Sequence, residues 1–448
     1  MPRALPAHRG TEQRVPVSAT RVADAKWDVL LVCVAAYLLT GIGHFQLVFP
    51  VLRPLKPALV AGILSIMLYL AAARGIRDVT RLWNPTTKYV LLILLWVALS
   101  VPGAIYQGGS FRLLTDAFIK TVVMYLVTVG AVRGARDVER LVFVYFLGAA
   151  VYAAVALSRG ALGGSDRLGG FRDYDPNDLA TYLLTALPFA LYFLVGQRRL
   201  VFRAVGGAGL VVLAMAFAHT GSRGGFLALV GVAVFFLLGY RSVRLRWRML
   251  GTAFLGLLLL VGASDSYWQR METLLHPEQD YNYTAAGGRW QLWQRGIGYM
   301  LQRPLFGLGA GNFGTAEGTI SPLVAQLQER DIGVKWSTAH NSFVEIGAEL
   351  GVPGLLFFAG VLITTFGALR AVRQAAPRVA PLGPGPPRLA HALMASLVGF
   401  TVGAFFLSFA YEAMLYTVAA FAVGLRKVTV SATLATPPLG GGLRRRHR

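Results

Sequence analysis

The stretch KYVLLILLWVALSVPGA, residues 88–104, carries one charged side chain, that of Lys88, in seventeen residues. A run of this length and hydrophobicity can cross the hydrocarbon core of a bilayer as a helix. Eleven similar runs occur near residues 27–44, 55–73, 115–132, 141–158, 179–196, 201–219, 225–240, 248–263, 353–369, 389–407 and 411–425. Hydrophobic residues make up 55% of the 448 positions and charged residues 14%. The sequence therefore predicts an all-α polytopic membrane protein with about twelve transmembrane helices.

The distribution of positive charge indicates the orientation of the chain. Its formal net charge is +22, but the basic residues form short clusters between the apolar runs, as in 133–140 and 241–248. Alternate connections carry most of these clusters, which is the pattern of cytoplasmic loops. We therefore expect both termini in the cytoplasm, membrane lipids as neighbours and no nucleic-acid partner. The single cysteine, Cys33, excludes a disulfide within one chain.

This orientation divides the chain into five parts. The expected parts are a basic cytoplasmic tail (1–26), transmembrane helices 1 to 9 (27–263), one large loop on the outer side (264–339), a histidine-containing helix with transmembrane helices 10 to 12 (340–425), and a second basic tail (426–448). Nine crossings place the large loop outside. Within it, residues 288–301 have the periodicity of an amphipathic helix that can lie along the membrane surface.

Ionisable residues gather where the chain is about to re-enter the membrane, in STAHNSFVEIGAELGVPG (337–354). We expect Ser337 or Thr338 to cap a helix of about three turns, with His340 and Asn341 in its first turn. Gly351 and Pro353 are stop signals for this helix. At helical spacing, Asn341, Glu345 and Glu349 share one face, which can meet a polar ligand.

The pattern of His340-Asn341, nine further residues, Gly351 and Gly354 resembles the O-antigen ligase family of bacterial membrane glycosyltransferases and the related O-antigen polymerases. Other features occur in the order usual for this family. They are an Asp-Pro-Asn helix start at 175–177, Arg223 followed by Leu227, a Gly-Arg-Trp start at 288–290 and a glycine-rich turn at 304–313. The resemblance covers about residues 170–355 with motifs, and it implies a fold of the GT-C class of glycosyltransferases.

Members of the family move a polysaccharide from undecaprenyl diphosphate to the lipid A-core oligosaccharide in lipopolysaccharide biosynthesis. The resemblance implies the same donor and acceptor here, on the periplasmic side of the inner membrane, with no cofactor. The diphosphate leaving group requires fixed cations, for which we expect Arg223 and Arg289, with Arg172 as a third. His340 suits a general base, because histidine has a reference pKa of about 6.5.

Several further expectations follow from this interpretation. We expect Asn341, Glu345, Glu349 and Glu412 to bind substrate, and we expect a metal-independent displacement that inverts the anomeric carbon. Asp173 and Asp175 could instead be a metal-ligand pair, but no second acidic cluster is visible on that side. An O-antigen polymerase and a protein O-oligosaccharyltransferase remain alternatives. A membrane transporter is less consistent with charges that crowd the outer face, because transporters bind at the midplane.

Overall fold

The computed structural model describes residues 27–72, 82–160, 167–171, 174–239, 244–276, 278, 280–331, 333, 336–375 and 385–435. The expected terminal tails, apart from residues 426–435, lie outside them. Helices are the only regular elements of this described part. Nine of its helical segments are long and apolar enough to cross a membrane. A helix coincides with each of the twelve apolar runs, but the count of twelve spans stays a prediction.

The first half of the chain contains α1 (Val29–Tyr37), α2 (Phe45–Val48), α3 (Pro57–Ala71), α4 (Pro85–Ser100), α5 (Gln107–Arg112), α6 (Ile119–Ala131), α7 (Ala135–Ser158), α8 (Pro176–Gly196) and α9 (Leu200–Thr220). The second half contains α10 (Arg223–Gly239), α11 (Leu245–Gly262), α12 (Asp265–Glu272), α13 (Tyr281–Thr284), α14 (Arg289–Gln302), α15 (Phe313–Thr319), α16 (Pro322–Gln328), α17 (Ser342–Ala375), α18 (Gly385–Gly403) and α19 (Ala413–Ala435).

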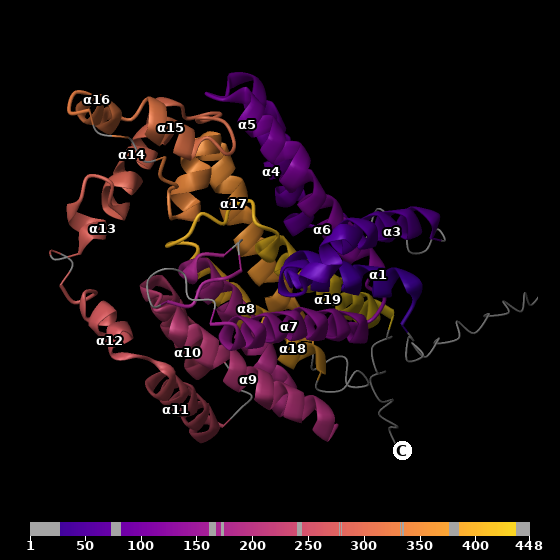
Figure 1. The fold of residues 1–448 in the computed structure, drawn as a ribbon. Coiled ribbons are helices and arrows are strands. Elements are labelled where there is room, and N and C mark those ends of the chain that lie inside the picture. The colour runs from indigo at the N-terminus through magenta and orange to yellow at the C-terminus, as the bar shows by residue number, and fades with distance from the viewer. Residues whose placement is uncertain are drawn as a thin grey trace, which may run out of the picture.

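Helix α8 lies at the centre of the bundle, in contact with α7, α9, α10 and α18 (Figure 1). The residues at its N-terminus strongly favour the start of a helix. Pro176 occupies the first turn, and the Asp175 carboxylate accepts hydrogen bonds from the backbone N–H groups of Asn177 and Asp178. Almost every side chain from Leu179 to Phe193 is buried. The first turn of α8 is therefore held in place by its cap and by the burial of the residues that follow it.

The start of α17 differs from the predicted helix. Asn341 is the capping residue, because its side-chain oxygen accepts hydrogen bonds from the backbone N–H groups of Phe343 and Val344. The expectation that Ser337 or Thr338 caps this helix is therefore wrong. His340 precedes the helix in a left-handed backbone conformation, with a φ of 48°. The histidine is thus presented from a turn and not from a helical first turn.

The predicted stop at Gly351 is a break inside α17. Gly351 has a φ of 69° and is non-helical, and the helix then continues to Ala375. A Cβ at this position would lie 2.3 Å from the carbonyl oxygen of Pro304, so only glycine fits. The freed N–H of Val352 donates to that same carbonyl, at 2.8 Å. The break therefore docks the turn after α14 against α17.

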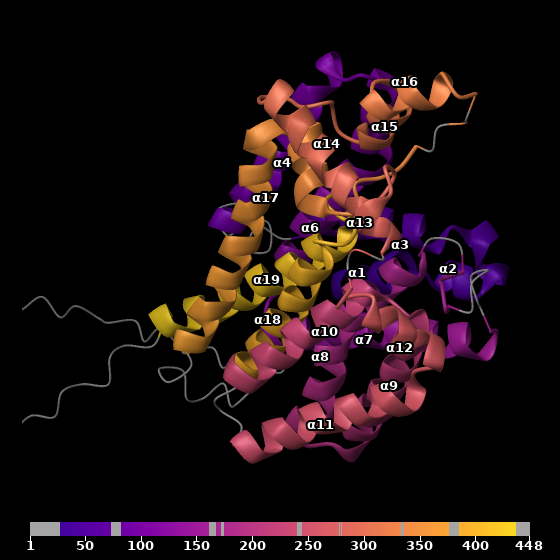
Figure 2. The same cartoon turned by 90° about the vertical axis from the view of Figure 1, so that its left-hand side faces the viewer.

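The segment from α12 to α16 arches along one side of the bundle, from α11 to the start of α17 (Figure 1). Its main helix, α14, confirms the helix predicted at 288–301, and it lies against α17 (Figure 2). Gly296 allows this contact, because a Cβ there would lie 2.3 Å from a methyl carbon of Val344. The opposite face carries exposed Trp290 and Leu301. One face of α14 thus packs on protein, and the other is exposed.

The connection between α18 and α19 is longer than expected. The predicted span reached residue 407, but α18 ends at Gly403 and α19 begins at Ala413. Residues 404–412 are tied to the start of α17 by the Ser342 hydroxyl, which donates to the carbonyl of Leu407 and accepts from the N–H of Phe409. The three-residue connection that the predicted runs 389–407 and 411–425 imply is therefore wrong, because residues 404–412 leave the helices to bond with the start of α17.

Candidate functional site

His340 lines a polar cavity of about 440 Å³. The wall is formed by His44, Tyr174, Asp175, Asp178, Thr338, His340, Ser408, Phe409 and Glu412. These residues come from four places in the chain: the end of the first helical segment, the start of α8, the residues that precede α17, and the 404–412 connection. The backbone N–H of His340 donates to the Ser408 hydroxyl at 3.0 Å, which fixes the turn that presents the imidazole.

The other predicted residues of the His340 motif have structural partners. Asn341 is buried and caps α17. Glu345 accepts a hydrogen bond from the N–H of Ala410, at 3.2 Å, and so braces the connection that carries Glu412. Glu349 is buried away from the cavity, where its two carboxylate oxygens accept from the N–H groups of Gly311 and Phe313. Of the four predicted substrate-binding residues in this region, only Glu412 lines the cavity.

Arg223 follows the two-residue turn between α9 and α10, as the sequence predicts. Its guanidinium is half-buried and paired with Asp280, just before α13. The two nitrogens reach the two carboxylate oxygens at 2.5 and 3.2 Å, and one nitrogen also donates to the Thr273 hydroxyl. This is the fork geometry with which arginine binds a carboxylate or a phosphate. The carboxylate of Asp280 is therefore bound to the guanidinium that we expected to bind a phosphate.

Arg289 begins α14 and lies close to Arg223. Burial lowers the pKa of the Arg289 guanidinium below its ordinary value, and the positive charge of Arg223 lowers it further. Asp175 and Asp280 partly offset both effects. Arg289 also lines a narrow cleft together with Asn177, at the start of α8. The structure thus brings together the two arginines that the sequence placed 66 positions apart.

Arg167 is a third arginine of this cluster, and the sequence analysis did not select it. Its guanidinium donates to the carbonyl oxygen of Thr220 at 2.7 Å and to the side chain of Asn177 at 2.9 Å. Burial lowers its pKa to about 10, and the charges of nearby arginines, including Arg223, contribute to this shift. The expected third arginine, Arg172, lies outside the described residues. Arg167 and Arg172 both belong to the glycine-rich arm, the segment between α7 and α8. The sequence offered no means to choose between these two arginines.

The cavity and the arginine cluster adjoin at the first turn of α8. Asp175 and Asp178 face the cavity, whereas Asn177 binds Arg167 and shares a cleft with Arg289. A second link runs through α14, because the indole N–H of Trp293 donates to the carbonyl of Ala339 at 3.1 Å. That bond joins the helix of Arg289 to the residue before His340. The arginine cluster and His340 are thus linked through α8 and α14.

Within the described residues, no three His, Cys, Asp or Glu side chains are placed to hold a metal ion. Asp173, half of the alternative metal-ligand pair, lies outside those residues. Its expected partner Asp175 caps α8 through its carboxylate.

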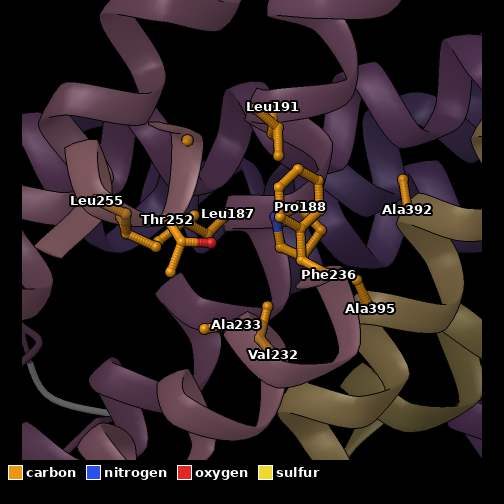
Figure 3. Close-up of a pocket in the computed structure, with 11 residues that line it drawn as sticks. Leu187, Pro188, Leu191, Val232, Ala233, Phe236, Thr252, Leu255, Ala392 and Ala395 are labelled. Atoms are coloured by element: carbon orange, nitrogen blue, oxygen red, sulfur yellow. The ribbon is translucent and has the colours of Figure 1, made fainter. Parts of the chain in front are cut away.

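A second pocket, of about 50 Å³, lies between α8, α10, α11 and α18 (Figure 3). Leu187, Pro188 and Phe236 form much of its lining, and none of its lining residues is ionisable. It offers no charged group that could hold a phosphate and no base that could take a proton. The candidate functional site is therefore the cavity at His340 together with the neighbouring arginines.

A comparison with known protein families gives a match that covers part of the chain. Residues 208–359 match the family described as O-Antigen ligase. The matched segment contains Arg223, Arg289 and His340, and it ends eight residues after the Gly351 break. No curated protein matches the sequence. The resemblance found in the sequence motifs is thus confirmed for residues 208–359, which match the O-antigen ligase family.

Proposed function

We propose that this protein is an O-antigen ligase that transfers a polysaccharide from undecaprenyl diphosphate to the lipid A-core oligosaccharide. Its family implies a membrane enzyme of the glycosyltransferase type. In this proposal, the site opens on the periplasmic side of a bacterial inner membrane, both termini are cytoplasmic, and the fold is of the GT-C class. The single observation that carries the proposal is the junction of a histidine-lined cavity with an arginine cluster at the start of α8.

The arginine cluster suits the donor. Two phosphates gain negative charge as the sugar leaves them, and fixed guanidinium groups near a low-dielectric boundary stabilise that charge. Arg223 and Arg289 are the groups we assign to the diphosphate. Arg167 is bonded to the Thr220 carbonyl and to Asn177, so we assign it to positioning the cluster.

The cavity suits the acceptor and its proton. An acceptor hydroxyl attacks the anomeric carbon, its oxygen forms the new glycosidic bond, and the bond to the diphosphate oxygen breaks with the electron pair leaving on the diphosphate. His340 takes the hydroxyl proton as general base, a step that typically contributes on the order of 100- to 10,000-fold. A single displacement of this kind inverts the anomeric carbon, and Glu412 is placed to bind acceptor hydroxyls.

The test is transfer by the purified, detergent-solubilised protein from an undecaprenyl-diphosphate glycan to lipid A-core, read as a gel mobility shift. We expect His340→Ala and Arg223→Ala to abolish transfer while the proteins elute and unfold as the wild type does. The matched control is His276→Ala. His276 lies on the α12–α13 segment with Glu278 as its partner, away from the cavity lining. Growth of the glycan on its carrier, or glycosylation of a protein, would replace the proposed acceptor with that of a polymerase or a protein glycosyltransferase.

A further inference from the structure

Two histidines line the cavity, and both have an unusual backbone. Among the described residues, four that are not glycine have a positive φ: His44, Lys56, Asp331 and His340. His44 has a φ of 50° and His340 a φ of 48°. A left-handed conformation is unfavourable for a residue with a side chain. Such residues are found preferentially at functional sites, where the surrounding structure holds them in place.

The structure holds His44 from several sides. Helix α1 widens into a π-helical turn at Leu38–Ile42, which ends at Gly43. Gly43 packs on Gly148 of α7, where a Cβ would lie 3.4 Å from the Gly148 Cα atom. This close approach brings His44 to the cavity wall. The first helical segment therefore ends next to a histidine that lines the cavity. The other lining residues come from the start of α8, the residues that precede α17 and the 404–412 connection.

A hydrogen-bonded tyrosine fixes the imidazole of His44. Its Nε2 atom lies 3.0 Å from the hydroxyl of Tyr174, and the two rings meet edge to face with centroids 4.9 Å apart. Tyr174 in turn stacks on Tyr182 of α8, with centroids 5.4 Å apart. Burial raises the pKa of Tyr174 well above its ordinary value, so its hydroxyl stays protonated. His44 is thus a preorganised polar group at the cavity, with an aromatic surface behind it.

The rest of the cavity wall indicates what His44 would bind. It presents the carboxylates of Asp175, Asp178 and Glu412, beside the hydroxyl groups of Thr338 and Ser408. Carboxylates, hydroxyls and imidazole nitrogens hydrogen-bond sugar hydroxyls, and aromatic rings pack on the apolar face of a sugar. Ionised carboxylates on this wall repel a phosphorylated or acidic ring by like charge. The anionic part of the donor belongs with the arginines on the other side of Asn177.

We propose that His44, oriented by Tyr174, is a second histidine of the acceptor site, and that this site takes a sugar ring without phosphate or carboxylate groups. The inference rests on the proposed transferase function, which by itself requires only His340 and the arginines. His44 is a binding residue for the acceptor in this arrangement. Its loss should therefore affect the acceptor and spare the donor.

The test is steady-state transfer by the purified, full-length protein with the His44→Asn variant, varying each substrate separately. Asparagine tolerates the left-handed conformation, so the variant keeps the backbone while removing the imidazole. We expect the acceptor KM to rise about tenfold, the donor KM to stay within about twofold, and the thermal unfolding midpoint to stay at or above that of the wild type. Lys56→Asn is the matched control, because Lys56 has a φ of 42°, is exposed and lies outside the cavity wall.

The outcomes separate this inference from the proposed function. An unchanged acceptor KM in His44→Asn, while the wild type transfers normally, overturns the role of His44 alone. A lower unfolding midpoint, with a proportionate loss of transfer whichever substrate is varied, would show that His44 has a structural role instead. A wild type that transfers to no hydroxyl acceptor overturns both proposals. Equal use of an acceptor whose terminal sugar is phosphorylated, compared with its dephosphorylated form, would overturn the assigned substrate class.

Discussion

The guanidinium of Arg223 grips the carboxylate of Asp280 through both of its terminal nitrogens. Asp280 is itself held by the backbone N–H of Asn282, at 3.0 Å, and it starts the short helix α13. A carboxylate and a phosphate compete for the same fork. If Arg223 binds the diphosphate of the donor, the donor must displace Asp280, and the α12–α13 segment must move with it.

This competition predicts that Asp280→Asn strengthens donor binding. The variant removes the internal anion but keeps a side chain that can cap α13. The pair is partly exposed, so solvent screens it, and we expect the donor KM to fall roughly threefold to tenfold, which corresponds to about 1 kcal/mol. The measurement is the donor dependence of transfer at fixed acceptor. Glu278→Gln is the control on the same segment, since Glu278 pairs with His276 and not with Arg223. A donor KM that rises would instead make Asp280 a residue that orients Arg223.

The pair also has a defined pH dependence. Burial alone would raise the pKa of Asp280, but the N–H of Asn282 and the Arg223 guanidinium outweigh it and hold the pKa below its ordinary value. A carboxyl group of this kind contributes stability above its unfolded pKa of about 4 and loses it as pH falls through the lower folded value. Between about pH 6 and 9 the Asp280 carboxyl group therefore stays ionised. We expect pH profiles of transfer that differ in height but not in shape between the wild type and Asp280→Asn. A profile that changes shape in this range would contradict that assignment.

Arg167 offers a test of positioning. Its guanidinium bridges the Thr220 carbonyl and the Asn177 side chain, and so joins the glycine-rich arm, the α9–α10 turn and α8. Lysine keeps the charge but cannot make both bonds in one plane. We expect Arg167→Lys to reduce kcat/KM for the donor by about tenfold, with a smaller effect on acceptor KM. Arg159→Lys, an exposed arginine stacked on Phe171, should leave both unchanged. Full activity in Arg167→Lys would show that charge alone suffices there.

Metal dependence is a separate prediction. The proposed displacement uses guanidinium groups where many glycosyltransferases use a divalent cation, so transfer should continue in excess EDTA. The measurement is the rate before and after chelation, with Mg²⁺ and Mn²⁺ added back. Loss of activity that either ion restores would assign the diphosphate to a metal and leave the arginines as its supports.

Local patterns determined how much of this structure could be predicted from sequence. Apolar runs predict helices because burial in lipid depends on the composition of each run, and α4, α8 and α14 begin within a few residues of their predicted starts. Motifs at fixed spacing identified His340, Arg223 and Arg289. By contrast, the start of α17 depends on bonds from Ser342 to Leu407 and from His340 to Ser408, which are 65 and 68 positions apart in the sequence. A prediction based on neighbouring residues alone therefore placed the cap of α17 at Ser337 or Thr338, ahead of its actual position at Asn341.

Residues that act across the fold could not be found in the same way. Asp280 is one of several acidic residues in a long connection, and nothing near it in sequence indicates that it meets Arg223. His44 follows two glycines at the end of an apolar run and resembles an interfacial histidine. Its role depends on Tyr174, which is 130 positions away. Glu349 was expected to bind substrate because it shares a helix face with Asn341, but that face is covered by the turn at 304–313.

Glu349 therefore predicts a loss of stability. Its carboxylate accepts from the N–H groups of Gly311 and Phe313 at 2.7 and 2.9 Å, and it is buried. Glutamine retains one acceptor oxygen and turns an N–H toward the other donor, and leaving a buried donor unpaired costs about 1 to 3 kcal/mol. We expect Glu349→Gln to lower the thermal unfolding midpoint and to leave both KM values unchanged in the folded fraction. Glu345→Gln is the comparison, since Glu345 is less buried and the bond that it accepts from the N–H of Ala410 is longer, at 3.2 Å. If Glu349→Gln instead unfolds like the wild type and raises a KM, its carboxylate binds substrate after the turn at 304–313 has moved away.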